Sequence, residues 1–418
     1  MNILVLGTGG REHALAWRLA KEADTKVYVH PGNGGTELAG FKNFGDLPLT
    51  PQRISARAQE NDVELIVIGP ETLLQEGYAD FFRREGFKVV GPGISGARLE
   101  TSKIFAKEFM VRAGVPTAPF EVFDRESELL NFKPKQWPAV LKYDGIAAGK
   151  GVVLAQSSAE IKEFAKRIYK DMEFGAGPHR VLVEDCLPGK ELSYIGLCDG
   201  KEFVPLASAT DFKRVGNSNT GANTGGMGAV SPSPLLTTEL ESKIHEKIVQ
   251  PVLSQMQRDR IDFRGVLYIG LMISPKGDPI VLEFNTRFGD PETQAIMMRW
   301  EENVIPALMA TAQSELTGLA PLKWRRETAV YVVAAAEGYP GKVTTGDMIT
   351  GIHELNAETP IFFSGVKMQG GKTYTHGGRV LGVGAYGTDV EGARKKAYGA
   401  LEKITWRGRH FRTDIGLL

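Results

Sequence analysis

The chain has 418 residues, which is too long for one ordinary core and predicts two to four packed units. Lysine plus arginine and aspartate plus glutamate number 50 each, so bulk charge gives no support for nucleic-acid or membrane binding. Its two cysteines, Cys186 and Cys198, exclude a disulfide framework and a cysteine metal cluster, and they favour a reducing compartment.

The first hundred residues alternate between strand and helix patterns, which predicts a parallel, doubly wound sheet. Strands are expected at 2–7, 26–30, 64–69 and 87–92, and helices at 11–22, 51–60 and 73–86. Glycine-rich loops follow the strand ends, where such sheets bind ligands. Because Met1 precedes a core strand directly and no apolar run reaches transmembrane length, we expect no signal peptide and a cytoplasmic protein.

The first of these loops, "GTGGRE", has three interpretations. A glycine-rich turn before a helix can bind a dinucleotide or a phosphate, or it can be a simple tight turn. A dinucleotide site also needs an acid after the second strand, and that strand ends in "YVHPGN" without one. A phosphate or small-ligand site is therefore favoured, and a nicotinamide oxidoreductase is disfavoured.

A helix at 101–114 opens the next region and ends at Gly114, with Pro116 beyond it. Lys103 lies in its first turn, where a cation opposes the helix dipole. A bound phosphate would remove that conflict, although a solvated lysine loses little. Further along, a helix is expected at 239–259, strands at 265–274 and 279–285, and a last unit from about Thr328.

The stretch "KYDGIAAGKG" looks like a phosphate loop but fails as a P-loop. Gly145 and Gly149 are too close together, and Lys150 is followed by Gly151 rather than by a serine or threonine. Apolar, β-branched residues flank the loop on both sides, which predicts the tip of a hairpin.

Three further stretches carry candidate chemistry. In "PIVLEFNTRFGDPET", Glu283 and Asn285 share one face of a strand and offer the oxygen ligands that Mg²⁺ accepts, while Arg287 could grip a carboxylate or a phosphoryl group. Glu184 and Glu191 could accept from a nucleotide, or they are surface carboxylates. Residues 209–232, beside Asp211, Lys213 and Arg214, look too rich in glycine and asparagine for a core and predict a flexible ligand loop or a plain surface loop.

Together these motifs resemble the ATP-grasp fold, and the particular strings resemble the glycinamide ribonucleotide synthetase family. The strings are "GTGGREHALAW", "PGNGGT", "IVIGPE", "KYDGIAAGKGVV", "NTGGMGA", "EFNTRFGDPETQ", "GYPG" and "HGGRVL", and they run over nearly the whole chain. The resemblance implies an N-terminal doubly wound domain at 1–100, an ATP-grasp region at 101–325 with a small lid at about 118–190, and a C-terminal α/β domain at 326–418.

The resemblance also implies a reaction in purine biosynthesis. ATP would phosphorylate the carboxylate of glycine, and the amine of 5-phosphoribosylamine would then attack the acyl phosphate to give glycinamide ribonucleotide, ADP and phosphate. ATP and Mg²⁺ (or Mn²⁺) are the implied cofactors, and the two small molecules are the implied partners, without nucleic acid or membrane. A monomer or weak dimer is expected.

Roles follow residue by residue from the resemblance. Lys103 and Lys142 would hold ATP phosphates, under the loop that includes Gly145, Gly149, Lys150 and Gly151. Glu184 and Leu187 would meet the adenine, and Glu191 the ribose. Glu283 and Asn285 would bind the metal, Arg287 the glycine carboxylate and acyl phosphate, and Asp211 the glycine ammonium; Arg287, Lys142 and Asp211 are the expected catalytic set. The phosphoribosylamine would be bound by Gly9, Gly10, Gly32, Asn33, Gly377, Gly378 and Arg379.

The sequence departs from the family pattern at a few positions. Histidine is common at the position of Phe212, asparagine at His376 and alanine at Gly34. Many ATP-grasp enzymes also carry an acid on the strand before the Glu-x-Asn pair, and strand 265–274 has none. Few protein ligands are therefore expected for the metal.

Two alternatives remain open. Another ATP-grasp ligase would keep Lys142 and Arg287 but lack "NTGGMGA" and "HGGRVL". A nucleotide-binding module without catalysis would have lost a metal ligand or Arg287. In the favoured interpretation, Arg287→Ala is expected to abolish turnover with little change in stability.

Overall fold

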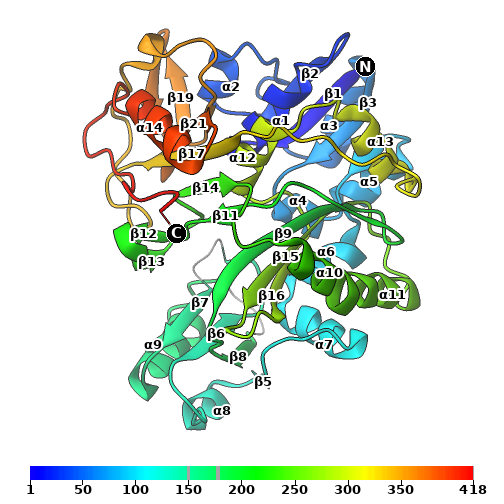
Figure 1. The fold of residues 1–418 in the computed structure, drawn as a ribbon, viewed down its shortest axis with the longest axis vertical. Coiled ribbons are helices and arrows are strands. Elements are labelled where there is room, and N and C mark those ends of the chain that lie inside the picture. Colours follow the sequence, from blue (N-terminus) through cyan, green and yellow to red (C-terminus); the bar gives the residue numbers. More distant parts are fainter. Residues whose placement is uncertain (148–150, 176–178, 418) are drawn as a thin grey trace.

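The structure is a computed structural model that describes residues 1–147, 151–175 and 179–417. In Figure 1 the N-terminal and C-terminal parts lie side by side at the top, a central sheet lies beneath them, and a smaller sheet lies at the bottom. This arrangement is the mixed α/β architecture that the sequence predicts.

The N-terminal sheet has the order β2-β1-β3-β4 and is parallel throughout. Its strands are β1 (Asn2–Gly7), β2 (Lys26–Pro31), β3 (Val63–Ile68) and β4 (Lys88–Val90). Its helices are α1 (Gly10–Leu19), α2 (Gly34–Leu38), α3 (Pro51–Glu60), α4 (Glu71–Gln75), α5 (Tyr78–Arg84) and α6 (Ile94–Thr101). Successive β1 side chains enter two different cores, Ile3 on one face and Leu4 on the other, which confirms the doubly wound sheet.

The single helix expected at 73–86 is wrong. The chain forms two helices there, α4 and α5, because Gly77 takes a left-handed conformation with φ of 78°. A left-handed residue cannot continue a right-handed helix, so the second helix starts anew after it.

The central sheet has the order β10-β9-β15-β16 and is antiparallel. Its strands are β9 (Lys190–Cys198), β10 (Phe203–Pro205), β15 (Gly265–Ile273) and β16 (Pro279–Asn285), and its helices are α7 (Lys103–Ala113), α10 (Thr238–Ile244) and α11 (Gln250–Arg258). The helix expected at 239–259 is present, with a π-helical segment at His245–Val249 just before Pro251, whose ring has no N–H to donate.

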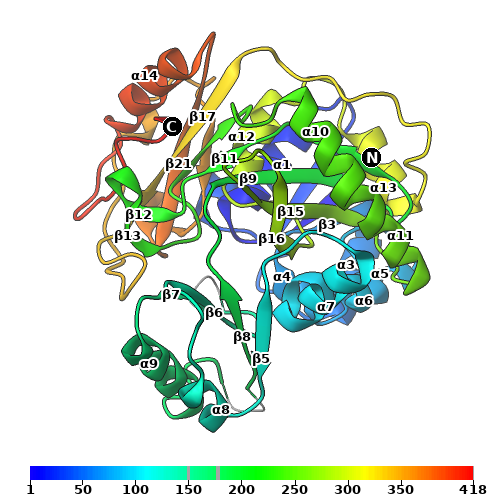
Figure 2. The same cartoon turned by 60° about the horizontal axis from the view of Figure 1, so that its bottom comes forward.

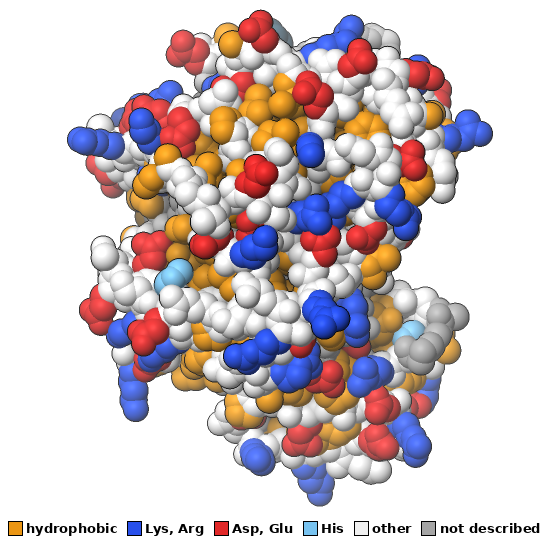
Figure 3. All heavy atoms as spheres, turned by 90° about the vertical axis from the view of Figure 1, so that its right-hand side faces the viewer, with side chains coloured by type: hydrophobic (Ala, Val, Ile, Leu, Met, Phe, Trp, Pro, Cys, Tyr) orange, Lys and Arg blue, Asp and Glu red, His pale blue; other side chains and the backbone are white. Residues whose placement is uncertain are grey.

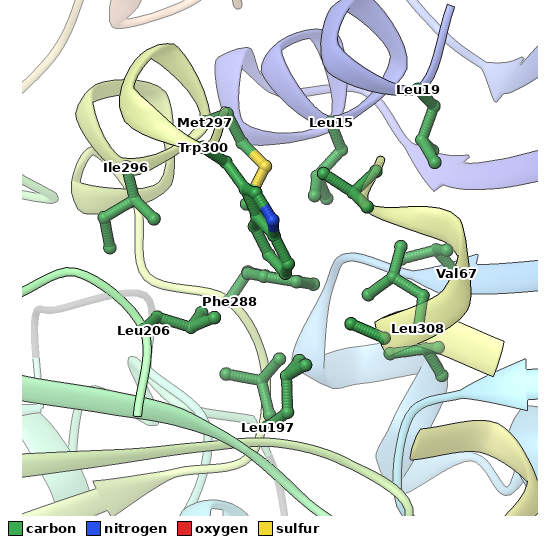
Figure 4. Packing of buried hydrophobic residues seen from close by; sticks show 14 of the residues in the cluster. Leu15, Leu19, Val67, Leu197, Leu206, Phe288, Ile296, Met297, Trp300 and Leu308 are labelled. Atoms are coloured by element: carbon green, nitrogen blue, oxygen red, sulfur yellow. The ribbon is translucent and has the colours of Figure 1, made fainter. Parts of the chain in front are cut away.

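A large apolar core joins the central sheet to the N-terminal sheet. Figure 4 shows Leu197 of β9 and Val67 of β3 reaching the same core as Phe288 and Trp300. Helix α13 (Ile305–Gln313) contributes Leu308 to this core. The two sheets are therefore held by shared packing as well as by the connecting chain.

The small sheet has the order β5-β8-β6-β7 and its own core with α8 (Glu126–Asn131) and α9 (Ser158–Tyr169). Its strands are β5 (Phe120–Phe123), β6 (Ala139–Tyr143), β7 (Val152–Ala155) and β8 (Val181–Asp185). Figure 2 shows this unit standing away from the rest of the molecule. Strands β6 and β7 pair antiparallel, which confirms the hairpin expected around "KYDGIAAGKG".

The C-terminal sheet has the order β11-β14-β17-β21-β18 and takes two of its strands from the middle of the chain. Its strands are β11 (Thr210–Asp211), β14 (Gly228–Ser231), β17 (Thr328–Ala335), β18 (Ile361–Phe363) and β21 (Arg379–Gly387); α12 (Glu292–Arg299) and α14 (Val390–Leu401) pack on it. Two hairpins flank it, β12 (Arg214–Gly216) with β13 (Thr220–Asn223), and β19 (Val366–Gln369) with β20 (Lys372–Thr375).

The expectation of a loop without a core role at 209–232 is therefore wrong in part. Residues 217–223 are exposed, but every residue of β14 is buried. Small residues suit this position because the strand lies between two others, and a Cβ at Gly228 would come within 2.6 Å of the Tyr331 backbone oxygen.

Charged side chains of both signs are interspersed over the face shown in Figure 3. This mixture agrees with the equal numbers of acidic and basic residues in the chain.

Candidate active site

The site is built around the end of β16, where Glu283 and Asn285 project from one face of the strand. Glu283 lies opposite Gly270 of β15, and Asn285 lies opposite Tyr268. A side chain at Gly270 would crowd Glu283, because a Cβ there would come within 3.2 Å of its Cγ. The glycine therefore leaves room for the carboxylate.

Glu283 is an anion whose charge is balanced by four nearby cations. Burial by itself raises the pKa of Glu283, but nearby positive charges outweigh it and lower the pKa to about 2. The cations come from helix α7, strand β6, the segment after β11 and the segment after β16, and they are Lys103, Lys142, Lys213 and Arg287. At neutral pH the carboxylate is ionised and surrounded by groups suited to phosphate.

Arg287 is held by two acids to which the sequence analysis assigned no role. Its Nη2 lies 2.9 Å from Oε1 of Glu100, and its Nε lies 3.5 Å from Oε2 of Glu71. The other oxygen of Glu100 accepts from the backbone N–H of Thr286 at 2.7 Å. Burial disfavours the charged guanidinium, but these acids raise the pKa of Arg287 above its usual value.

Beside Glu283 lies a pocket with an apolar floor and charged walls. Leu99, Ala106, Met110, Leu282 and Phe284 supply the apolar side, and Lys103, Lys107, Lys142, Glu184 and Glu283 the charged side. Lys142 donates to the Leu282 carbonyl at 3.1 Å and lies 3.0 Å from Oε1 of Glu184. Lys103 lies in the first turn of its helix as expected, where it is the first residue of α7, and it donates to the Glu100 carbonyl at 3.0 Å.

Leu187 and Glu191 lie on the chain that leaves β8 and enters β9. Leu187 is half-buried, while Glu191 is exposed and lies 3.0 Å from Nζ of Lys213. A second pocket adjoins the first at Glu283 and is lined by Glu191, Leu192, Ser193, Lys213, Tyr268, Gly270, Leu271, Leu282 and Glu283.

Asp211 ends β11 near this second pocket. Its Oδ1 is buried and has no hydrogen-bond partner within the described ranges. Burial, and then the charge of Glu292, raise the pKa of Asp211 well above its usual value. Glu292 in turn accepts from the Ser193 hydroxyl at 3.0 Å, and that hydroxyl lies 2.7 Å from the Tyr268 hydroxyl.

The N-terminal loops lie together beside the C-terminal sheet. Asn33 donates to the Thr8 carbonyl at 2.7 Å and to the Phe363 carbonyl at 2.9 Å, while its Oδ1 caps α2 by accepting from Gly35 N–H at 2.7 Å. Gly32 donates to the Gly7 carbonyl at 3.1 Å. The side chain of Asn33 is thus already used in joining these segments.

The Gly9–Gly10 turn is occupied by a carboxylate of the protein itself. Gly9 N–H donates to Oε2 of Glu12 at 2.7 Å, and Gly10 N–H donates to the Ser364 hydroxyl at 3.0 Å. Glu12 is buried and also lies 2.6 Å from Nε of Arg11. Where a dinucleotide phosphate would lie, the chain therefore places an anion.

Arg379, the first residue of β21, is paired with Asp290 through Nη1 and Nη2 of its guanidinium, at 3.1 and 2.8 Å. Gly377 packs against Gly365, where a Cβ on Gly377 would come within 2.9 Å of the Gly365 Cα, and Gly378 packs against Tyr339. Through this pair Arg379 contacts the segment after β16, because Asp290 lies on that segment a few residues beyond Arg287.

Of the loop predicted to cover the phosphates, Gly145 and Gly151 are described, and the Gly151 carbonyl accepts from Tyr143 N–H at 2.7 Å. Gly149 and Lys150 lie outside the described residues. The remaining predicted site residues group into two places: one around Glu283 and one around Gly9, Asn33 and Arg379.

Family models match three consecutive parts of the chain. They are the N domain of phosphoribosylglycinamide synthetase over residues 1–100, its ATP-grasp (A) domain over 101–293 and its C domain over 329–418. A phosphoribosylamine–glycine ligase of Pasteurella multocida is 42% identical over 100% of this chain and 97% of the relative. The chain belongs to the phosphoribosylglycinamide synthetase family.

Solved structures agree with this family assignment. A crystal structure of phosphoribosylamine–glycine ligase from Thermotoga maritima has a TM-score of 0.85 and 36% identity, covering 99% of this chain and 100% of that one. A biotin carboxylase from Campylobacter jejuni has a TM-score of 0.73 at 16% identity, covering 100% of this chain and 94% of that one, and shows the shared ATP-grasp fold alone. As in its relatives, the enzyme is a ligase.

Several site residues were missed by reasoning from the sequence. Lys107 carried a signal, since it lies one helical turn after Lys103 on the same face. Glu292 and Asp290 lie inside the motif "RFGDPETQ" that was singled out. Glu71 ends the quoted string "IVIGPE" but was given no role, and Glu100 gave no local signal; only the fold brings the two acids to Arg287.

The described part of the chain offers no group of three or more His, Cys, Asp or Glu side chains that could hold a metal. It also has no helix long and apolar enough to cross a membrane.

Proposed function

We propose that the enzyme joins glycine to 5-phosphoribosylamine through a glycyl phosphate, and that the reaction takes place at the two adjoining pockets around Glu283. A glycine carboxylate oxygen attacks the γ-phosphorus of ATP, and ADP leaves. The amine nitrogen of phosphoribosylamine then attacks the carbonyl carbon of the glycyl phosphate; phosphate leaves, the nitrogen loses one proton, and glycinamide ribonucleotide forms. The first step supplies a leaving group that free glycine lacks, and it needs cations to neutralise developing charge.

The first pocket suits ATP. Lys103 and Lys142 face it from two sides and would bind the phosphates, while its apolar floor would receive the adenine. Glu184 and the chain at Leu187 would meet the adenine edge, and exposed Glu191 would accept from the ribose hydroxyls. These roles follow the family pattern and the kinds of residue that line the pocket.

Glu283 and Asn285 suit one Mg²⁺ or Mn²⁺ ion, because an ionised carboxylate and an amide oxygen are hard donors. With so few protein ligands within the described ranges, the remaining ligands would be phosphate oxygens and water. Bound there, the ion would neutralise negative charge on the transferred phosphoryl group.

Arg287 and Asp211 suit the two charged ends of glycine. The guanidinium of Arg287 would pair with the carboxylate, and later with the acyl phosphate. Asp211 offers a buried oxygen that lacks a partner, which an ammonium group would satisfy. Glu292, which raises the pKa of Asp211, adds a second negative charge facing the same place.

Phosphoribosylamine would bind where the three parts of the chain meet, at Gly9, Gly10, Gly32, Asn33, Gly377, Gly378 and Arg379. Glu12 changes what the Gly9 end can recognise. A carboxylate there accepts hydrogen bonds, so it favours sugar hydroxyls over the phosphate, and the phosphate would lie nearer Arg379.

The observation that carries the proposal is that Lys103, Lys142 and Lys213, from separate segments, line the two pockets that meet at Glu283. The test is ADP release with ATP, glycine and phosphoribosylamine, and with each omitted in turn. We expect full activity only with all three. ADP formation that ignored phosphoribosylamine, or required another amine, would contradict the substrate assignment, and ATP binding without any ADP release would favour a non-catalytic module.

We also propose that the enzyme is a cytoplasmic monomer or weak dimer with domains at 1–100, 101–325 and 326–418 and a lid at about 118–190. The small separate sheet at 120–185 supports the lid. Analytical ultracentrifugation over a range of concentrations tests the assembly, and a stable tetramer would contradict it.

A further inference from the structure

Lys107 is a buried cation that the reaction outlined above does not use. Its side chain is 2% exposed, and its Nζ lies 3.3 Å from Oε1 of Glu184. The same oxygen lies 3.0 Å from Nζ of Lys142, so two ammonium groups share one carboxylate oxygen. Burying an extra charge costs free energy, so a single structural ion pair does not explain the second lysine.

The two lysines differ in how firmly they are fixed. Lys107 lies in the middle of α7 and donates at 2.5 Å to the Thr117 hydroxyl, which itself donates to the Val281 carbonyl at 2.8 Å. Lys142 lies next to the last residue of β6, and its other contact is the Leu282 carbonyl. Lys107 is thus tied to two elements outside the small sheet.

Binding of ATP would leave Glu184 without one of its two cations. In the proposed function Lys142 turns to the phosphates, and it then leaves Glu184. Glu184 is 3% exposed and lies beside the apolar floor of the pocket, where a carboxylate without a cation is strongly disfavoured. A second, fixed cation would keep it ionised and in place.

We infer that Lys107 is a positioning residue for the nucleotide: it holds Glu184 as an oriented anion for the adenine amine while Lys142 moves to the phosphates. The inference rests on the proposed roles of Lys142 and Glu184. It assigns Lys107 to ATP affinity and to recognition of the amino group on the base, and not to glycine or to the chemical steps.

The experiment measures ATP binding to the full-length enzyme by calorimetry, without glycine or phosphoribosylamine, so it does not depend on turnover. Lys107→Met keeps the length of the side chain and removes the charge. We expect the Kd for ATP to rise about tenfold or more, while the Kd for inosine triphosphate, which lacks the amine, changes less. In turnover, KM for ATP should rise while KM for glycine and kcat at saturating ATP stay unchanged.

A matched control is Arg112→Met on the same helix. Arg112 is partly exposed and pairs with Asp259 at 2.9 Å, so its loss should leave ATP binding unchanged. Thermal unfolding of both variants checks that they are folded.

The decisive comparison repeats Lys107→Met in a Glu184→Gln background, where an uncharged amide replaces the carboxylate and Lys107 has no anion to hold. If Lys107 acts through Glu184, its removal weakens ATP binding much less there. An equal loss in both backgrounds, an unchanged Kd in folded Lys107→Met, or an equal rise in KM for glycine would overturn the inference. Failure of the proposed function would instead show as wild-type enzyme that binds ATP without making product.

Discussion

At the scale of single residues, the site is a set of charges that hold one another before any substrate binds. Arg287 illustrates this, because the residue proposed to grip glycine is also the counter-charge of Glu100. The expectation that Arg287→Ala leaves stability almost unchanged therefore needs revision. Glu100 is 4% exposed, and removal of Arg287 leaves the buried Glu100 carboxylate without its positive partner.

We predict that Arg287→Ala lowers turnover by at least about a hundredfold and also destabilises the fold by about 2 to 4 kcal/mol. Both effects follow from the loss of one guanidinium, which would bind the glycine carboxylate and also pairs with Glu100. ADP release measures the first, and urea unfolding measures the second.

The control is the double variant Arg287→Ala with Glu100→Gln, which removes the stranded charge. It should recover part of the lost stability and none of the lost turnover. An Arg287→Ala enzyme as stable as the wild type would show that the pair with Glu100 contributes nothing.

At the scale of elements, backbone conformation sets where a helix is interrupted, and apolar periodicity alone does not predict that position. The residues at 73–86 have a helical pattern, yet Gly77 divides them into α4 and α5. The break lets α5 start in a new direction, and Asp80 on α5 then accepts from Ile94 N–H at the start of α6 at 2.8 Å.

We predict that Gly77→Ala destabilises the protein by about 1 to 2 kcal/mol, because alanine resists the left-handed conformation. The new Cβ would also approach Cδ1 of Ile94 at 2.8 Å. Gly399→Ala is the matched control: Gly399 lies inside α14, and a Cβ there meets no atom within 4 Å. Gly399→Ala should stabilise the protein by about 0.5 to 1 kcal/mol. Thermal unfolding should therefore show a lower Tm for Gly77→Ala and a higher Tm for Gly399→Ala.

At the scale of the whole molecule, contacts between distant segments create the second half of the site. Strands β11 and β14 leave the central region to pair within the C-terminal sheet, which brings Asp211 beside Glu292. The pair of Asp290 with Arg379 joins the end of the central region to the start of β21. The C-terminal domain is thus tied to the central region through both strands and charges.

We predict that Asp290→Asn destabilises the protein by about 2 to 3 kcal/mol near neutral pH. Burial raises the pKa of Asp290, but Arg379 and then Arg11 lower it below the usual 3.8. Because the folded pKa is the lower one, the stabilisation is present above pH 3.8 and is lost as the pH falls further.

Urea unfolding at several pH values checks this prediction. The difference between wild type and Asp290→Asn should shrink below pH 3.8. Asp278→Asn is the control, since Asp278 forms an exposed pair with Lys247 and its loss should change little. A pH-independent difference for Asp290→Asn would show that the charge of the pair is not its source.

Much of the fold could be predicted because its signals are local. The strands around Asn2–Gly7 and Pro279–Asn285, the helix at Lys103–Ala113 and the β6–β7 hairpin follow from side-chain periodicity and end signals. Strand β14 could not be predicted, since its glycine and alanine resemble a loop until the neighbouring strands enclose it.

By itself the sequence determined the family, the doubly wound N-terminal sheet, and the residues Lys142, Glu283, Asn285 and Arg287 as one group, because these depend on short strings and on residues two apart along a strand. Only the tertiary structure decided that Glu71 and Glu100 hold Arg287, that Lys107 shares Glu184 with Lys142, and that Glu12 fills the Gly9 turn. Such pairs join residues whose distances are set by how the sheets and helices pack, and no local pattern in the chain encodes that packing.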